Sequence, residues 1–209
     1  MGASGSGKTT LVKLLLGFYE PLSGSIRVGD TLLSEFNLGW WRSQCGAVMQ
    51  EGYLFSDTIA RNIAISDDEP DIERIRQAAR VANIADYIEA LPLGYNTMIG
   101  QDGQGISQGQ RQRILIARVV YKNPMFVFLD EATNALDANN ERAITENLAE
   151  FYKGKTVVVV AHRLSTVRDA DQIVVLDAGK IVEVGTHEEL TAKRGKYFAL
   201  VKNQLELGN

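Results

Sequence analysis

The first ten residues, Met1-Gly-Ala-Ser-Gly-Ser-Gly-Lys-Thr-Thr10, fit the phosphate-binding pattern Gly-x-x-x-x-Gly-Lys-Thr. Glycines let successive backbone N–H groups converge on a phosphate, and the helix expected from Leu11 favours negative charge at its start. Lys8 can reach the β- and γ-phosphates of a nucleotide, and the Thr9 hydroxyl can ligate Mg²⁺. A glycine- and serine-rich linker would not run straight into an apolar helix. The stretch therefore predicts a nucleoside triphosphate site built from Gly2, Ser4, Gly5, Ser6, Gly7, Lys8, Thr9 and Thr10.

Polar side chains also follow three predicted strands, at the point where each strand ends. Gln50 and His162 each follow one such strand, and Asp130 and Glu131 together follow another. In open α/β sheets, ligands bind outside the carboxyl ends of the strands. We therefore expect these four residues to lie at one edge of the sheet.

The Asp130–Glu131 pair follows a wholly apolar strand, where carboxylates are costly to bury without a charged partner. Mg²⁺ carried by a nucleotide would be such a partner, and Asp130 is placed to hold it directly or through water. Glu131 could polarise an attacking water, and His162 could bond the γ-phosphate or fix that water. The alternative is that the two carboxylates only cap the following turn. The phosphate loop in the same chain favours the metal-binding interpretation over this one.

A second anion-attracting feature begins at Ser107, ahead of the helix expected over 114–120. Ser107 is a good N-cap, and Gln110 three residues later has the spacing of a capping box. With the flexible Gly109 between them, the helix start is open to a phosphate. An ordinary capped helix is the alternative, and the residues alone do not say which nucleotide this helix faces.

Strand and helix patterns alternate along the chain, which predicts an α/β fold, and the phosphate loop makes the P-loop NTPase type the expected one. We expect a mostly parallel sheet flanked by helices, with an inserted α-helical subdomain. One ATPase domain would contain a core over 1–66 and 123–209 and the helical subdomain over 67–122, whose first helix starts at the acidic cluster 67–70. Strands are expected over 25–30, 45–49, 125–129, 156–160, 172–176 and 181–184, with a hairpin turn over 177–180 between the last two. Helices are expected over 38–44, with Asn37 as its cap, and over 84–90, 139–152, 186–193 and 195–207, and a glycine-rich loop over 91–105.

A phosphate loop normally joins a buried strand to a helix, and here only Met1 precedes it. We therefore expect the N-terminal strands of the domain to be absent from this chain. The net charge of -4 and pI near 5.3 show no global basic footprint for nucleic acid. The single cysteine, Cys45, excludes an internal disulfide and is expected to pack. No apolar run approaches the roughly 20 residues needed to span a bilayer, so a membrane role needs segments outside the chain.

Taken together, the chain resembles the ATPase domain of ATP-binding cassette (ABC) proteins over all 209 residues. Five motifs stand in that family's order and rough spacing. They are the phosphate loop, Gln50, the signature Ile106-Ser-Gln-Gly-Gln110, the strand Phe126–Glu131, and His162. Asn134-Ala-Leu-Asp137 matches the loop that crosses the dimer in the family. The signature between Gln50 and the carboxylate pair is the most specific of these motifs.

The resemblance implies a head-to-tail homodimer that sandwiches two ATP molecules. Ser107, Gly109 and Gln110 of one subunit would contact the γ-phosphate held by Lys8 of the other, and Asp137 would lie in the crossing loop.

The resemblance also implies a division of roles at the nucleotide. Thr9 and Gln50 would ligate Mg²⁺, and Asp130 would hold the ion through water. Glu131 would be the general base, and His162 would position the γ-phosphate.

The finer pattern resembles ABC exporters, and within them bacterial peptide or bacteriocin transporters. Residues 50–63 resemble the exporter segment whose apolar surface receives a coupling helix from the membrane domain, and Gln108 is a signature variant associated with exporters. The resemblance implies ATP-driven export at the cytoplasmic face of the cell (inner) membrane, through transmembrane domains fused in the full-length protein.

Two other functions stay open at this point. A soluble ABC ATPase of DNA repair or translation is disfavoured by the acidic charge, the single cassette and the lack of a long heptad stretch. An importer ATPase made as a separate subunit is the other alternative. The sequence does not identify the transported substrate.

Overall fold

The computed structural model describes residues 1–3, 5–100, 105–161 and 167–207, which group into two compact units. Unit 1 joins Met1–Arg42 to Val159–Asn209, and unit 2 comprises Ser43–Val158. The phosphate loop belongs to unit 1, whereas the signature and the Asp130–Glu131 pair belong to unit 2. The boundaries predicted for the core and the helical subdomain remain a prediction.

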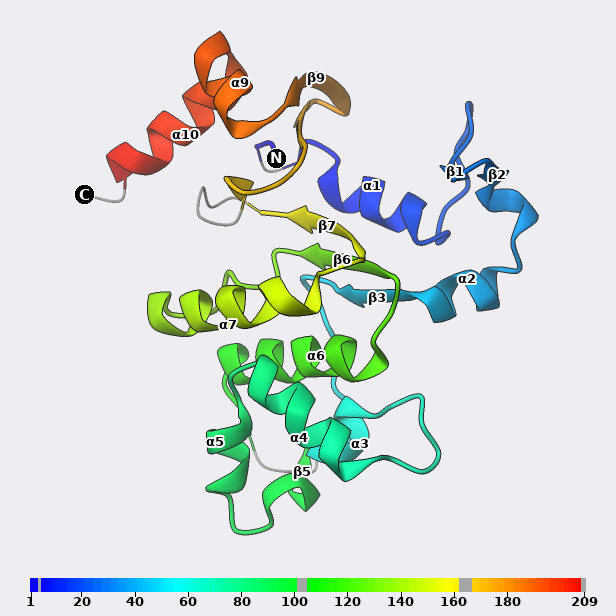
Figure 1. The fold of residues 1–209 in the computed structure, drawn as a ribbon, viewed down its shortest axis with the longest axis vertical. Coiled ribbons are helices and arrows are strands. Elements are labelled where there is room, and N and C mark those ends of the chain that lie inside the picture. Colours follow the sequence, from blue (N-terminus) through cyan, green and yellow to red (C-terminus); the bar gives the residue numbers. More distant parts are fainter. Residues whose placement is uncertain (4, 101–104, 162–166, 208–209) are drawn as a thin grey trace. The chain divides into compact units, whose positions relative to one another are not determined.

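Unit 1 combines the first helix with a C-terminal hairpin and two further helices (Figure 1). Its elements are α1 (Lys8–Leu15), β1 (Arg27–Val28), β2 (Thr31–Leu32), the 3₁₀ turn η1 (Leu33–Glu35), α2 (Leu38–Gln44), β8 (Ile173–Asp177), β9 (Lys180–Gly185), α9 (His187–Lys193) and α10 (Lys196–Leu207), with α2 running on past the end of the unit.

The β8–β9 hairpin forms at the turn that the sequence predicts, with Asp177 opposite Lys180. It packs on the two C-terminal helices through a cluster of Ile173, Val175, Leu190, Tyr197 and Val201. The main chain of Met1 lies along β8, because its carbonyl accepts a hydrogen bond from the Leu176 N–H at 2.8 Å. The hairpin therefore supports the chain that enters the phosphate loop.

The end of α1 is joined to α2 by a buried tryptophan. The indole N–H of Trp41 donates to the Leu15 carbonyl at 3.0 Å, and its side chain is 3 % exposed. Trp40 stacks on Phe36 and is half exposed. Asn37 caps α2 as predicted, since its side chain accepts from the Trp40 N–H. The strand expected over 25–30 is shorter and consists of β1 alone.

Unit 2 contains a short parallel strand pair and a group of helices. Its elements are β3 (Cys45–Val48), β4 (Asp57–Thr58), α3 (Ile59–Ile63), α4 (Ile72–Val81), α5 (Ala85–Glu89), the 3₁₀ turn η2 (Gly94–Asn96), β5 (Met98–Ile99), α6 (Gln108–Lys122), β6 (Phe126–Asp130), α7 (Ala138–Phe151) and the start of β7 (Thr156–Val160).

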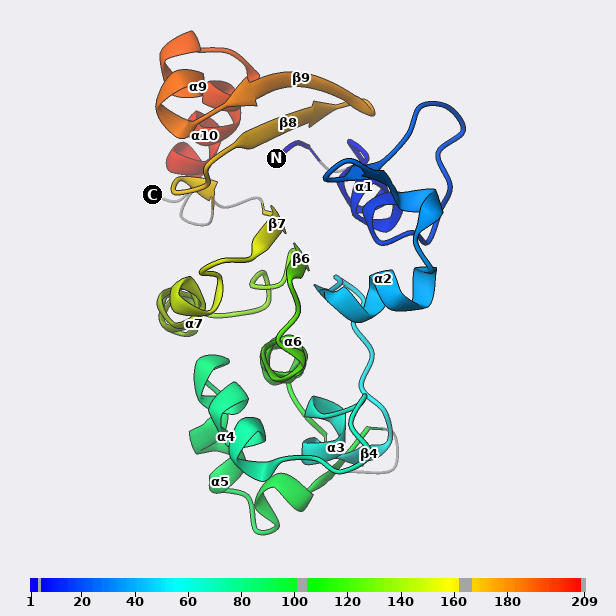
Figure 2. The same ribbon diagram turned by 45° about the vertical axis from the view of Figure 1, so that its right-hand side comes forward.

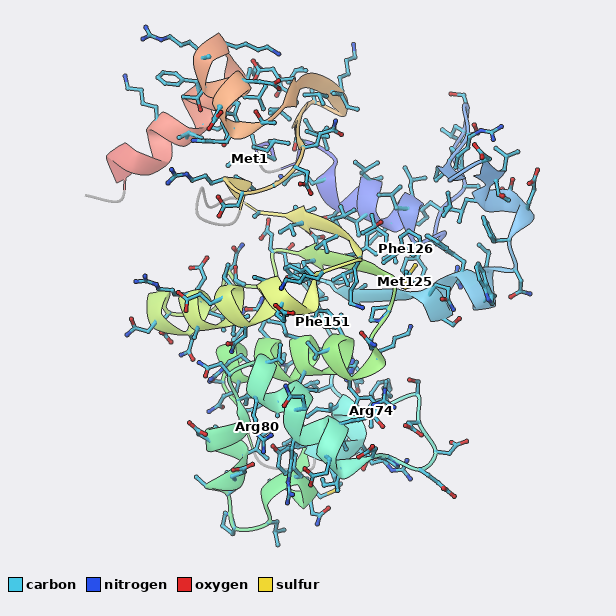
Figure 3. The ribbon with its side chains drawn as sticks, viewed as in Figure 1. Met1, Arg74, Arg80, Met125, Phe126 and Phe151 are labelled. Carbon is cyan, nitrogen blue, oxygen red and sulfur yellow. The ribbon has the colours of Figure 1, made fainter. Side chains whose placement is uncertain are left out.

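The β3 and β6 strands are parallel, with Cys45 opposite Phe126 and Val48 opposite Leu129, and the sheet order is β3-β6-β7. Figure 2 shows α6 between this strand pair and the helices α3 and α4. Figure 3 shows Phe126 at the start of β6, and Arg74 and Arg80 along α4. The predicted parallel α/β arrangement is confirmed.

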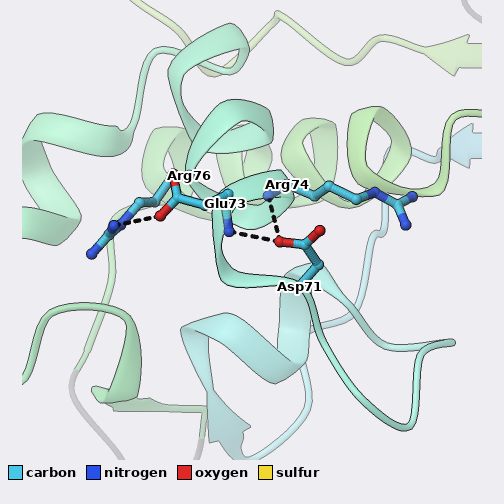
Figure 4. Close-up of polar contacts among 4 residues, drawn as sticks. All are labelled: Asp71, Glu73, Arg74 and Arg76. Carbon is cyan, nitrogen blue, oxygen red and sulfur yellow. Dashed lines mark hydrogen bonds and ion pairs between the residues drawn. The ribbon is translucent and has the colours of Figure 1, made fainter.

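The first helix of the predicted subdomain starts later than its acidic cluster suggests. Asp71 is the N-cap of α4, and its carboxylate accepts from the N–H groups of Glu73 and Arg74 (Figure 4). Asp67 instead accepts from the Tyr121 hydroxyl at 2.5 Å. An aspartate next to the first helical turn displaces the more distant cluster because only a near side chain can reach the terminal N–H groups.

In its described part, the loop expected over 91–105 contains two elements that were not predicted, η2 and β5. The β5 strand pairs antiparallel with β4, Asp57 opposite Ile99. None of the described helices is long and apolar enough to cross a membrane.

Candidate functional site

The phosphate loop in unit 1 is compact and is organised around the Lys8 side chain. The Lys8 ammonium donates to the carbonyls of Gly2 at 2.9 Å and Ala3 at 2.8 Å, and lies 3.4 Å from the Ser6 hydroxyl. Lys8 is only 7 % exposed. The ammonium lies at the end of a flexible four-carbon stem, so it can exchange these carbonyls for phosphate oxygens.

Two glycines are required by the geometry of this loop. A Cβ on Gly2 would lie 2.3 Å from the Leu176 carbonyl oxygen, so no larger residue fits beside β8. Gly7 precedes α1 with φ of 95°, a left-handed conformation that other residues adopt at a cost. No side chain caps α1 at Gly7, so the first N–H groups of the helix face the loop.

Of the other residues predicted in the loop, the structure describes Gly5, Thr9 and Thr10. Thr9 is half-buried and Thr10 is exposed, both in the first turn of α1, and Gly5 is exposed. Ser4 lies outside the described residues, as does His162.

In unit 2, the parallel register brings Gln50 and Asp130 to the same end of the β3–β6 pair. Val48 lies opposite Leu129, so Gln50 follows its strand by two residues and Asp130 ends the other. Asp130 is 1 % exposed, and both of its carboxylate oxygens lack a hydrogen-bond partner among the described residues. A buried carboxylate without a donor is costly, and this one fits a hard divalent cation such as Mg²⁺.

Glu131 directly follows and has an uncommon backbone conformation. Its φ is 54°, which is rare for a residue with a side chain. One oxygen of its carboxylate accepts from the Asn134 side-chain amide at 2.7 Å. The side chain is half-buried. Positive φ at a carboxylate beside a buried aspartate is the kind of local strain that accompanies function.

The signature residues begin α6 with the capping box that the sequence predicts. The Gln110 N–H donates to the Ser107 hydroxyl oxygen at 3.2 Å, and the Ser107 N–H donates to the Gln110 side-chain oxygen at 2.8 Å. The Ser107 hydroxyl accepts in this pair, so its own hydrogen can be donated to a further oxygen.

Asp137 lies at the start of α7, six residues after Glu131. Its carboxylate accepts from the Asn140 backbone N–H at 3.0 Å and from the Asn140 side-chain amide at 2.5 Å. These hydrogen bonds lower the pKa of Asp137 below its usual value. Asp137 is exposed, which leaves its charge available to a partner.

Gln112 is a residue of this region that sequence reasoning missed. It is 7 % exposed, and its side-chain amide bonds the main chain of the turn after β6 on both sides. A signal was present, since Gln112 precedes the apolar Leu115, Ile116 and Val119 by three, four and seven residues. That spacing places it on the buried face of the helix.

The segment after Gln50 presents aromatic side chains at the surface. Tyr53 and Phe55 are 61 % and 48 % exposed and meet edge to face. Arg118 of α6 donates to the Tyr53 carbonyl at 3.0 Å, and the buried Asn62 bonds the main chain of Phe55. The aromatic surface therefore stands on a rigid polar support.

The structure thus brings together two groups of predicted residues, one in each unit. Gly2, Ser6, Gly7 and Lys8 form the loop of unit 1. In unit 2, the ends of β3 and β6 share one edge, and the start of α6 contacts the turn that follows β6.

The comparisons with known proteins agree on one family. The sequence model of the ABC transporter family matches residues 1–134. The chain is 49 % identical to an ATP-dependent lipid A-core flippase of Alkalilimnicola ehrlichii, over 98 % of this chain and 35 % of the flippase. It is 48 % identical to ABC transporter B family member 21 of Arabidopsis thaliana, over 98 % of this chain and 16 % of that protein.

A solved structure, that of a bacterial Atm1-family ABC exporter with ATP bound, superposes with a TM-score of 0.92. It is 39 % identical and matches 97 % of this chain and 36 % of the exporter chain. The chain therefore spans about a third of the length of these bacterial relatives and a smaller part of the plant one.

Proposed function

The chain belongs to the ABC transporter family and is an ATPase domain of that family, and from this premise we propose that its ATP hydrolysis powers the export of a substrate across a membrane. The observation that carries the proposal is the pair of carboxylates, Asp130 and Glu131, at the end of β6. A buried aspartate without a described hydrogen-bond partner stands directly before a strained, half-buried glutamate. This arrangement supports a metal-assisted attack of water on a phosphoryl group.

In the proposed reaction, Lys8 and the first N–H groups of α1 bind the β- and γ-phosphates. Glu131 accepts a proton from the attacking water while the bond between the γ-phosphorus and the bridging oxygen breaks. The products are ADP and phosphate. His162 would position the γ-phosphate.

The donor set fits Mg²⁺, because Thr9, Gln50 and Asp130 offer hydroxyl, amide and carboxylate oxygens. The unpartnered carboxylate of Asp130 supports this most directly. When bound, Mg²⁺ would neutralise charge on the phosphate oxygens.

A second ATP-binding surface is proposed at the signature. Ser107, Gly109 and Gln110 of one subunit would contact the γ-phosphate bound by a second copy, with Asp137 in the crossing loop. The ordered helix start of α6 supports this, because its cap leaves the Ser107 hydroxyl able to donate. The homodimer across two ATP molecules is part of this proposal.

Association with a membrane is supported by relatives that are named as a flippase, an ABC transporter and an exporter. We place the domain at the cytoplasmic face of the cell membrane, bound to fused transmembrane domains. The Tyr53 and Phe55 surface would receive a helix of those domains. The resemblance to bacterial peptide or bacteriocin exporters stays a prediction, and the transported substrate is unidentified.

The test is a Glu131→Gln substitution in the full-length protein that carries this chain. We expect kcat for ATP to fall by roughly 10²–10⁴-fold with ATP still bound, because a positioned general base contributes about that factor. Glu150→Gln is the matched control, since Glu150 is exposed on α7 and pairs only with Lys153 among its described contacts. A Glu131→Gln protein that hydrolyses ATP at the parent rate would refute the general-base role.

The dimer has a separate test in the same variant. With hydrolysis blocked, ATP should hold two domains together, and size-exclusion chromatography coupled to light scattering would report the mass. Adding Ser107→Ala should weaken that association. A mass that does not depend on ATP would count against the sandwich.

A further inference from the structure

The turn that follows β6 is joined to α6 by one side chain, that of Gln112. Its amide nitrogen donates to the Glu131 carbonyl oxygen at 3.1 Å, and its amide oxygen accepts from the Ala135 N–H at 3.1 Å. Gln112 is 7 % exposed. The donor and the acceptor of one buried amide thus each bond the main chain, one at the start of the turn and one near its end.

The residue that Gln112 contacts is held in a costly conformation. Glu131 has φ of 54°, and a left-handed backbone is unfavourable for a residue with a side chain. Such strain persists only where surrounding contacts over-determine it. The Glu131 carbonyl accepts two hydrogen bonds, from the Gln112 side chain and from the Asn134 N–H at 3.2 Å.

The orientation of the Glu131 carboxylate follows from this backbone. A rotation about the N–Cα bond of Glu131 would move its carbonyl and its Cα–Cβ bond together, and would draw the carboxylate away from the Asn134 amide. The helix contacts the turn at a second point, because a Cβ on Gly109 would lie 3.1 Å from the Ala135 carbonyl oxygen. The first turns of α6 are therefore bonded to the turn after β6 at Gln112 and lie close against it at Gly109.

We propose that Gln112 is a positioning residue for Glu131: its two hydrogen bonds hold the turn so that the carboxylate faces the water it deprotonates. The proposal rests on the proposed function, in which Glu131 is the general base. Gln112 touches neither substrate nor reacting atoms in this account. It acts through the Glu131 main chain, from the helix that begins with the signature.

Two substitutions separate the hydrogen bonds from the packing, in the full-length protein that carries the chain. Gln112→Met keeps nearly the same volume and removes both hydrogen bonds. Gln112→Glu keeps an acceptor for the Ala135 N–H but loses the donor to the Glu131 carbonyl. Gln77→Met is the matched control, because Gln77 is exposed on α4 and makes no described side-chain hydrogen bond.

We expect both Gln112 variants to lower kcat for ATP by roughly 10- to 100-fold, since a 1 Å misplacement of a reacting group can cost about 10²-fold. The KM for ATP should stay within about twofold of the parent, and Gln77→Met should match the parent throughout. Parental kcat in either Gln112 variant overturns the proposal. Where thermal melting shows that Gln112→Met does not fold, Gln112→Glu alone decides in the same way.

A double-mutant cycle gives a readout that a purely structural role would not produce. In a Glu131→Gln background, Gln112→Met should cause no further loss of kcat, because no base remains to be positioned. An equal fold-loss in both backgrounds shows a general structural effect and overturns the proposal. If Glu131→Gln itself keeps the parent rate, the general-base assignment has failed, and this result is distinct from a failure at Gln112.

Discussion

Removing the Asn62 side chain should loosen the aromatic surface formed by Tyr53 and Phe55 without unfolding the rest of unit 2. Asn62 is 1 % exposed in α3. Its amide oxygen accepts from the Phe55 N–H at 2.8 Å, and its amide nitrogen donates to the carbonyls of Phe55 at 3.0 Å and Thr58 at 3.1 Å. The segment before α3 is therefore bonded to one side chain at both its N–H and its C=O.

The magnitude follows from these three bonds. A net contribution of about 1 kcal/mol each gives about 3 kcal/mol for an Asn62→Ala substitution. The Phe55 N–H would also lose its partner in a partly buried site. At 1.4 kcal/mol per factor of ten, local opening of this segment should become roughly 100-fold more frequent.

Hydrogen–deuterium exchange followed by mass spectrometry measures that opening directly. Peptides covering 53–63 should exchange roughly 100-fold faster in Asn62→Ala, while peptides from α10 in unit 1 serve as an internal reference. Asn147→Ala is the matched control. Asn147 is exposed on α7, and its amide makes a long 3.2 Å bond to the Val81 carbonyl.

One result would refute the reasoning about Asn62. If the 53–63 peptides exchange at the parent rate, the segment is held by Arg118 and the neighbouring packing alone. If all peptides speed up together, the substitution destabilises the whole domain rather than this surface.

Three further predictions concern helix capping, thiol reactivity and the pH dependence of stability. Ser107→Ala removes the cap of α6 and should lower the free energy of unfolding, measured by urea denaturation, by about 1 kcal/mol. Thr186→Ala removes the capping box of α9 and serves as the comparison. An unchanged urea midpoint in Ser107→Ala would show that the capping box of α6 contributes nothing. Burial raises the pKa of the Cys45 thiol from 9.0 to about 11, so iodoacetamide at pH 8 should label the folded protein far more slowly than the urea-unfolded one. Because the folded state holds this proton more tightly, stability should fall as the pH rises from about 9 to about 11, and Cys45→Ala should lack that loss.

Features that depend on neighbouring residues in the chain follow from sequence patterns. The capping box of Ser107 and Gln110 and the hairpin turn at 177–180 both form as predicted. Each involves contacts within a few residues, so residue type and spacing are sufficient. The parallel β3 and β6 strands are also predictable, because continuous apolar runs indicate strands covered on both faces.

Other features depended on partners that are distant in sequence. The β4–β5 pair joins residues about 40 positions apart and lies in a stretch that the sequence indicated as a loop. The start of α4 was misplaced, because Asp67 bonds Tyr121 instead of capping the helix. Residue type at such positions does not reveal which of several polar partners will be within reach.

The residue types and order of the motifs predict the family, which the comparisons confirm, and they predict the residues of the site: a phosphate loop, a carboxylate pair after an apolar strand, and a capped signature helix. The folded chain adds what spacing does not contain. The φ of 54° at Glu131, the unpartnered carboxylate of Asp130 and the bridge from Gln112 all arise where α6 packs on the turn after β6. Hydrogen bonds between elements form only when packing brings their donors and acceptors to about 3 Å, and that packing is a property of the whole unit rather than of any one segment.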